Sequence, residues 1–208
     1  MLIKKEFFSI NLSEKFELNF EEFGDFTTRT QVDCDMATTQ SIREAMLRFK
    51  NSQMINEDVL DHGISVPLFL MLPELKDIKI CSISVSGTDL LDHFEFGKKI
   101  SEKIKTTPNN LAIFASGDLS HCLNKKAPAG YFPKGAKLDQ KLIEQLKTKD
   151  TRAVLQTNKD LMDKPMACAP RALAVLLGVL DDCEYETNIL SYESPFGVGN
   201  LTALFEFS

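Results

Sequence analysis

The stretch IKICSISVSGTDLLDHFEFGKKISEKIKTTPNNLAIFASG, residues 78–117, decides the fold class. Its first ten residues form a β-branched run that ends in glycine, a pattern typical of a buried strand. Leu90, Phe94 and Ile100 then fall on one arc of a predicted helix. LAIFASG, residues 111–117, predicts a second buried strand. Two buried strands joined by one helix form a βαβ unit, whose strands pair in parallel through a right-handed crossover.

Further helices and strands are predicted on both sides of this unit. Residues 38–49 and 138–146 have amphipathic helical patterns, and ACAPRALAVLLGVL (167–180) is apolar almost all round, which predicts a central buried helix. Strands are expected in the first 26 residues and in the C-terminal segments EYETNILSYE and LTALFEF. We therefore expect an α/β fold, a single domain over residues 1–208 with a mixed, mostly parallel β-sheet flanked by helices.

The composition narrows the kind of partner. A net charge of -6, with no run of Lys or Arg longer than a pair, lacks the basic surface of a nucleic-acid binder. No stretch approaches the roughly 18 apolar residues of a membrane span. The first residues do not form a secretory signal, and five cysteines without a C-x-x-C pair argue against a disulfide framework or a structural zinc site. We expect a cytoplasmic protein with a small-molecule or protein partner.

Polar groups with catalytic chemistry lie at the ends of three predicted apolar segments or strands. They are His62 in the corner Asp61-His62-Gly63, the pair Asp118 and His121, and Glu193. In α/β folds such groups gather beyond the carboxyl ends of strands, where loops direct them into a crevice. A histidine can hold a metal ion or transfer protons near neutral pH, and a carboxylate is a hard oxygen ligand. Two histidines and one carboxylate are the ingredients of a non-haem iron(II) site.

Four motifs in order carry a resemblance to a known family. They are DHGISVPLFLM (61–71), SGDLSH (116–121), APAGYFPKGAKLDQ (127–140) and SYESPFGVG (191–199). Together they resemble the class III extradiol ring-cleavage dioxygenases, the family of LigB-type catalytic subunits and Memo-like proteins. The resemblance runs from about Phe8 to the end of the chain. The order and spacing of several motifs make it specific, whereas each motif alone would be weak.

The resemblance implies an α/β fold and, in catalytic members, one Fe(II) held by two histidines and a glutamate. Glu193 matches the glutamate ligand of the metal. His121 matches the acid/base histidine that moves protons during cleavage of a catecholic aromatic, with Asp118 orienting it. His62 matches a second histidine that contacts the substrate or dioxygen. The implied partners are a small aromatic substrate and dioxygen, with no nucleic acid and no membrane.

This sequence departs from the family in its metal ligands. The two histidine ligands of the family lie in N-terminal motifs, and this chain starts after both. Three interpretations stay open: an N-terminally shortened dioxygenase domain, a partner subunit that supplies the ligands, or a non-catalytic Memo-like binding protein without the iron site. In the first two, the missing strands would leave a sheet edge uncovered, which a homodimer would protect.

Structural alternatives stand beside these functional interpretations. His121 could simply be satisfied by Asp118, His62 could belong to a turn that begins a helix, and Glu193 could be a solvated loop residue. His93 falls on the apolar arc of its helix and is predicted to be a partly buried structural histidine.

Further side chains near His121 in sequence suggest other chemistry. Cys122 could be a reactive thiol but is more typical of a small packed residue. Ser116 and Ser120 lie close in sequence to His121 and Asp118, but no G-x-S-x-G elbow presents a serine, so a serine hydrolase is disfavoured.

Overall fold

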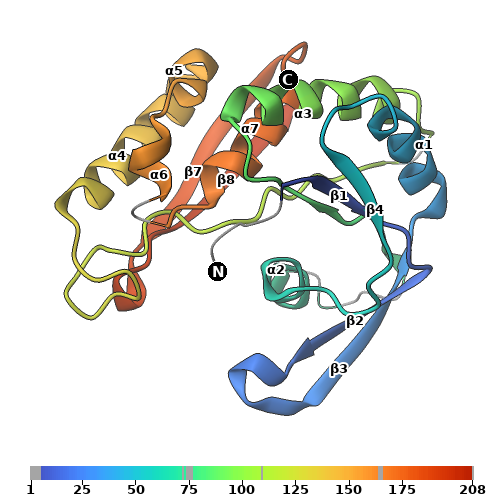
Figure 1. Ribbon diagram of the computed structural model, residues 1–208, viewed down its shortest axis with the longest axis horizontal. Helices are drawn as coiled ribbons and strands as arrows, with labels where there is room; N and C mark the ends of the chain where they lie inside the picture. Colours follow the sequence, from blue (N-terminus) through green and yellow to red (C-terminus); the bar gives the residue numbers. More distant parts are fainter. Residues whose placement is uncertain (1–5, 72, 74–76, 109, 164–165, 208) are drawn as a thin grey trace. The chain divides into compact units, whose positions relative to one another are not determined.

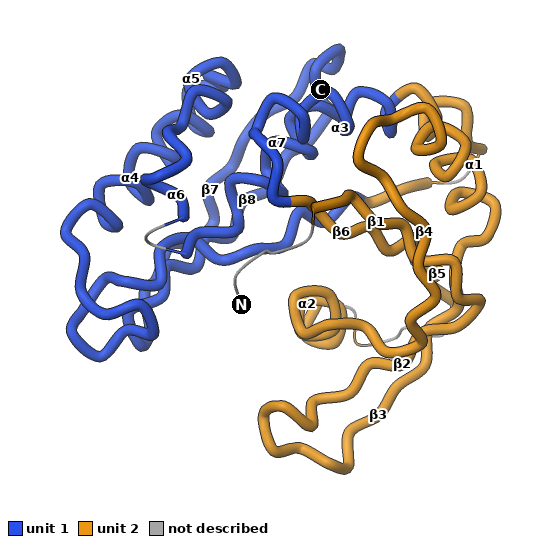
Figure 2. The backbone as a smooth tube through the Cα atoms, viewed as in Figure 1, with its two compact units in different colours: residues 1–4, 87–101, 113–208 blue, residues 5–86, 102–112 orange. Residues whose placement is uncertain are grey.

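The computed structural model describes residues 6–71, 73, 77–108, 110–163 and 166–207. Its backbone forms two compact units, each assembled from separate stretches of chain (Figure 2). Among the described residues, unit 1 comprises those in the ranges 87–101 and 113–207, and unit 2 comprises those in the ranges 6–86 and 102–112. The division does not test the prediction of one domain over residues 1–208, which stays a prediction.

Unit 2 contains two small mixed sheets among its described residues. The strands are β1 (Phe8–Asn11), β2 (Lys15–Phe20), β3 (Asp25–Cys34), β4 (Ser52–Ile55), β5 (Lys79–Ile80) and β6 (Ile83–Ser84). In one sheet β1 pairs in parallel with β4 and antiparallel with β6, and in the other β3 pairs antiparallel with β2 and in parallel with β5. The helices are α1 (Met36–Met46), α2 (His62–Met71) and the 3₁₀ turn η1 (Glu21–Phe23). Helix α1 packs on β1 and β4, and α2 packs on β2 (Figure 1).

Helix α1 begins two residues earlier than its sequence pattern predicts. The sequence predicts a helix from Thr38, capped by threonine. The helix begins instead at Met36, because the Asp35 carboxylate accepts a hydrogen bond from the Thr38 amide at 3.1 Å. An aspartate cap of this kind typically stabilises a helix by about 1 kcal/mol. The core of unit 2 consists of Phe16, Leu18, Val32, Cys34, Leu60 and Leu68.

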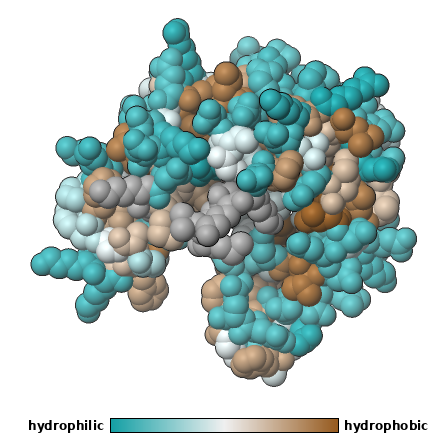
Figure 3. All heavy atoms as spheres, viewed as in Figure 1, coloured by the Kyte–Doolittle hydropathy of each residue, from teal (hydrophilic) through white to brown (hydrophobic). Residues whose placement is uncertain are grey.

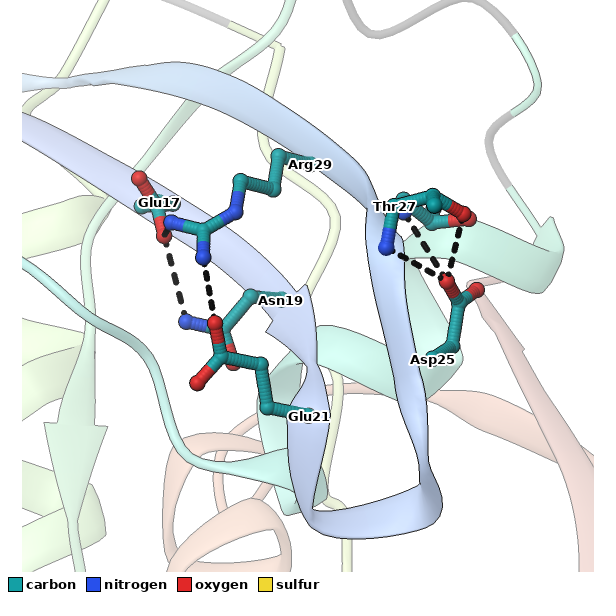
Figure 4. A network of polar contacts seen from close by, with 7 residues as sticks. Glu17, Asn19, Glu21, Asp25, Thr27 and Arg29 are labelled. Carbon is teal, nitrogen blue, oxygen red and sulfur yellow. Dashed lines mark hydrogen bonds and ion pairs between the residues drawn. The ribbon is translucent and has the colours of Figure 1, made fainter.

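The β2–β3 hairpin carries a polar network on its exposed side (Figure 4). Arg29 bridges Glu17, at 3.1 Å, and Glu21. Near the turn, Asp25 Oδ1 accepts hydrogen bonds from the amide and hydroxyl of Thr27, both at 2.9 Å. Hydrogen bonds from Thr28 and Thr27 lower the pKa of Asp25 below its ordinary value. These exposed ion pairs add little stability each, so the hairpin depends mainly on its buried face.

Two thiols of unit 2 lie beside one hydroxyl. Thr39 Oγ1 is 3.2 Å from Cys34 Sγ, and it also forms a hydrogen bond with the Cys81 thiol. Burial raises the pKa of Cys81 to about 12. In the folded protein these thiols are therefore neutral at physiological pH and suit packing better than nucleophilic chemistry.

The raised pKa of Cys81 predicts slow alkylation. At pH 8 iodoacetamide should label Cys81 more than about 100-fold more slowly in the folded protein than in urea, because only the thiolate reacts. Peptide mapping by mass spectrometry measures both rates. Because the folded state favours the neutral thiol, Cys81 should lower the stability only as the pH rises from about 9 towards about 12. Equal labelling rates in buffer and urea would contradict the burial of this thiol.

Unit 1 packs helices against a two-stranded antiparallel sheet. Its elements are α3 (Leu90–Ile104, whose last residues belong to unit 2), α4 (Pro133–Lys147), α5 (Thr151–Leu155), α6 (Lys159–Asp163), α7 (Ala169–Val179), β7 (Tyr185–Glu193), the 3₁₀ turn η3 (Pro195–Gly197) and β8 (Asn200–Phe207). Strands β7 and β8 form the sheet, and α4 packs on β7, α5 and α6 (Figure 1). The predictions of an amphipathic helix over 138–146, a buried helix at α7 and two C-terminal strands are confirmed.

The βαβ prediction is wrong in detail. Residues 111–117 form no strand, and Leu111, Ile113 and Phe114 are exposed. The first predicted strand splits into β5 and β6, which pair with different sheets. A strand needs a neighbour to satisfy its backbone groups, and an apolar pattern does not show whether that neighbour is present.

The α/β class with mixed pairing is confirmed. Among the described strand pairs, however, parallel pairing does not predominate, since β1–β4 and β3–β5 are parallel and the other pairs are antiparallel. The sequence pattern missed this because alternation and burial fix the face of a strand but not the direction of its partner.

Helices α3 and α7 approach each other closely at two glycines. A Cβ atom on Gly97 would overlap the main-chain carbonyl of Val175, and one on Gly178 would overlap the carbonyl of Phe94. The neighbouring Phe94 joins the main core of unit 1, which also contains Leu119, Leu138, Leu142, Leu146, Val154, Ala167, Ala169, Leu173 and Leu177. Only glycine allows this crossing.

The visible surface is mainly hydrophilic, with apolar atoms in separate patches (Figure 3). Strongly exposed apolar side chains include Phe23, Phe26, Leu70 and Phe196. Among the described residues, no helix combines the length and the apolar composition that crossing a bilayer requires.

Candidate functional site

Asp118 and His121 lie together in the loop that follows residues 111–117. His121 Nε2 is 3.2 Å from Asp118 Oδ2, an ion-pair distance, and the imidazole side chain is only 14% exposed. The alignment of the two groups is not that of a hydrogen bond, and within the described structure Nε2 is buried without one. Buried polar atoms are normally hydrogen-bonded. A histidine beside a carboxylate with an unsatisfied nitrogen suits a group that binds a ligand or changes its protonation.

The backbone of Asp118 is anchored at the start of α7. Its carbonyl accepts hydrogen bonds from the amides of Cys168, at 3.0 Å, and Ala169, at 2.9 Å. Its amide donates to Cys168 Sγ at 3.1 Å. A Cβ atom on Gly117 would overlap the backbone of Ala169, so the two segments touch directly. The buried helix therefore fixes the position of Asp118 in unit 1.

A buried carboxylate on α4 contacts the residues next to His121 and Glu193. Asp139 is fully buried, and its Oδ1 accepts hydrogen bonds from the Ser120 amide at 3.0 Å and the Ser120 hydroxyl at 2.6 Å. Its Oδ2 accepts one from the Tyr192 hydroxyl at 2.8 Å. Burial, followed by the hydrogen bond to Asp139 and its charge, raises the pKa of Tyr192. Hydrogen bonds to a charged group contribute about 1.5–3 kcal/mol each, so this cluster outweighs any exposed ion pair.

Glu193 is the last residue of β7, where it is exposed and pairs with Asn200 of β8. Main-chain hydrogen bonds tie the segment after it to the histidine loop. The Leu119 amide donates to the Gly199 carbonyl, and the Gly199 amide donates to the Ser120 carbonyl, both at 2.9 Å. The structure thus connects the Glu193 segment to the Asp118–His121 segment within unit 1.

His62 belongs to unit 2 and is described with it. It is the first residue of α2, as the interpretation of a turn that begins a helix expects. His62 Nδ1 is 2.9 Å from Glu22 Oε1, and the Phe23 ring meets the imidazole edge-on with centroids 5.9 Å apart. Glu22 and Phe23 come from η1, some 40 residues earlier in the chain, so no local signal could predict this contact.

The remaining candidate side chains are structural. His93 is fully buried, with Nδ1 2.8 Å from the Asp89 carbonyl, which confirms the structural prediction. Cys122 is fully buried, and burial raises its pKa, so the packed interpretation holds. Ser120 is buried, and its Oγ donates to Asp139 at 2.6 Å and lies 3.0 Å from the Gly135 carbonyl, so its hydroxyl has a structural role.

The donor groups described above do not fit a three-ligand iron(II) site. Within the described residues, no group of three or more His, Cys, Asp and Glu side chains could hold a metal ion. His62 contacts Glu22, His93 is buried against Asp89, and His121 pairs with Asp118. Glu193 is therefore not part of a group of three or more such donors among the side chains that the structure describes.

A comparison with known families decides the relationship. The model of the catalytic LigB subunit of aromatic ring-opening dioxygenase matches residues 4–205. The chain belongs to the LigB family. Membership supports a dioxygenase-like function, and members generally use Fe(II).

Two curated proteins are similar to this LigB-family chain over part of their length. Protein CA_C1420 of Clostridium acetobutylicum is 33% identical over 196 residues, which is 94% of this chain and 40% of that protein. The 4,5-DOPA dioxygenase extradiol of Portulaca grandiflora is 32% identical over 103 residues, 47% of this chain and 36% of that enzyme. Each match thus spans less than half the length of the curated relative.

The fold of the LigB-family chain is similar to that of a solved structure. The crystal structure of the uncharacterized protein JW3007 from Escherichia coli K12 matches with a TM-score of 0.69 and 17% identity. The match covers 95% of this chain and 80% of that one. It supports the α/β fold alone.

Sequence reasoning missed Asp139 as a site residue. A signal was present, because Asp139 shares a helical face with Leu142 and Leu146, both buried. A carboxylate on an apolar stripe must find partners or unfold the helix. The partners themselves, Ser120 and Tyr192, lie 19 and 53 residues away and could not be read from the pattern.

Proposed function

We propose that this chain is an extradiol ring-cleavage dioxygenase domain that acts on a catecholic aromatic, with His121 as its acid/base residue. The observation that supports this most is the Asp118–His121 pair, with its buried unsatisfied nitrogen, in a chain of the LigB family. The likeness to an enzyme named 4,5-DOPA dioxygenase extradiol agrees with an aromatic diol as substrate.

In this proposal the pair handles one proton of the diol. A catechol hydroxyl donates its proton to the His121 imidazole, and the Asp118 carboxylate, 3.2 Å from Nε2, stabilises the resulting cation. The low exposure of His121 limits exchange of that proton with water. His62 contacting the substrate or dioxygen is part of the same proposal, as is Glu193 binding a metal ion.

Iron dependence belongs to the proposal and rests on the family. The donor set among the described residues does not fit Fe(II) by itself, so no step is assigned to the metal here. The same misfit favours a second candidate function, a Memo-like protein that binds an aromatic ligand without ring cleavage.

Oxygen consumption separates the two candidates. The purified chain is incubated anaerobically with Fe(II), freed of excess metal and mixed with catechol in air-saturated buffer. A dioxygenase should bind iron and consume one dioxygen for each catechol lost, and a yellow ring-opened product should appear. Binding of catechol without oxygen uptake would contradict the dioxygenase proposal and support the Memo-like binding protein.

A further inference from the structure

We infer that Asp139 is a positioning residue, which holds the His121 loop and the Glu193 strand in register through Ser120 and Tyr192. Ser120 immediately precedes His121, and Tyr192 immediately precedes Glu193. One buried carboxylate therefore contacts the neighbour of each proposed site residue. That the two segments belong to a functional site rests on the proposed function, whereas their alignment by Asp139 is a feature of unit 1 itself.

The two oxygens of Asp139 serve different segments. Oδ1 accepts both hydrogen bonds of Ser120, at 3.0 Å and 2.6 Å, and Oδ2 accepts the Tyr192 hydroxyl at 2.8 Å. Helix α4 supplies the carboxylate, so three segments distant in sequence meet at one group. Water does not compete with either partner for the carboxylate, since Asp139 is fully buried.

Glycine at position 199 leaves room for the Asp139 carboxylate. A Cβ atom on Gly199 would overlap Asp139 Oδ2. The backbone of the same Gly199 bonds to both Leu119 and Ser120. The carboxylate and these main-chain bonds therefore both hold the segment around Ser120 in place.

Asp139→Asn tests this role with little change of size. An amide offers one acceptor oxygen in place of two, so Ser120 and Tyr192 can no longer both donate a hydrogen bond to residue 139. The His121 ring signal in a ¹H–¹³C spectrum should move, and the dissociation constant for 4-nitrocatechol should rise about 10-fold. The chain has only three histidines, which makes the ring signals assignable by substitution.

Asp150→Asn is the matched control. Asp150 caps α5 by accepting the Ala153 amide at 2.9 Å, also through a carboxylate oxygen, but contacts neither site segment in the described structure. It should lower the melting temperature while leaving the His121 signal in place and the affinity within about twofold. Tyr192→Phe removes one bond only and provides a milder variant should Asp139→Asn fail to fold. It should shift the His121 signal less and weaken binding about 3-fold.

A folded Asp139→Asn protein with the His121 signal unmoved would overturn the assignment. Where Asp139→Asn does not fold, a folded Tyr192→Phe protein with that signal unmoved would do the same. An Asp150→Asn protein that shifts the signal equally would also overturn it. If the wild-type chain bound no 4-nitrocatechol, the proposed function would fail, but the ring signal would still decide whether Asp139 positions His121.

Discussion

Replacing His121 by alanine is expected to lower the turnover of catechol by about 10²–10⁴-fold, the usual contribution of a general acid or base. The reason is that the Asp118–His121 pair would no longer accept the proton of the diol. Steady-state oxygen uptake with Fe(II)-treated protein measures the loss. The melting temperature should change by no more than a few degrees, because the lost side chain belongs to a loop and its buried Nε2 forms no hydrogen bond in the described structure.

Asp118→Asn is the companion to this variant. It keeps the shape of the side chain but removes the charge that would stabilise the imidazolium, so a smaller loss of about 10–100-fold is expected. A His121→Ala protein that retains more than a tenth of the wild-type turnover would remove this residue from the chemistry. Equal turnover in the wild type and Asp118→Asn would show that the carboxylate is only a structural neighbour.

Replacing Gly178 by alanine is expected to destabilise the fold by about 3 kcal/mol or more, at the upper end of the usual cost of overpacking. The added methyl would overlap the Phe94 carbonyl, a main-chain atom of α3 that cannot turn away as a side chain would. The two helices must separate, and the core around Phe94 loses contacts. For a chain of this size the melting temperature should fall by roughly 6–12 °C.

Gly130→Ala is the matched control for the glycine crossing. Gly130 has a positive φ of 70° and open space where a Cβ would be placed. Its replacement should cost only about 1–2 kcal/mol, the penalty of the left-handed conformation. Thermal unfolding followed by circular dichroism compares both variants. A Gly178→Ala protein as stable as Gly130→Ala would mean that α3 and α7 tolerate a wider crossing.

Periodicity predicted the parts of the fold that are decided locally. Helix α7 and the strands β7 and β8 follow from apolar patterns that each element carries in its own residues. Residues 111–117 have an equally clear strand pattern, yet they form no strand and most of them are exposed. The difference is physical, since a strand is completed by a neighbour that its own sequence does not contain.

In the candidate site, too, contacts between residues close in sequence could be predicted and contacts between distant residues could not. Asp118 and His121 are three residues apart, so their contact could be predicted from spacing and the family motif. The contacts of His62 with Glu22, and of Asp139 with Tyr192, join residues 40 and 53 positions apart. Such contacts depend on how helices and strands pack, which a single sequence does not specify.

The most direct measurement of the central claim is a titration of the chain with 4-nitrocatechol, followed through the histidine ring signals. If the Asp118–His121 pair binds the diol, the His121 signal should shift and saturate with the same dissociation constant as the absorbance change of the ligand. The signal of the buried His93 should stay in place. A saturating titration in which His121 does not move would contradict the account.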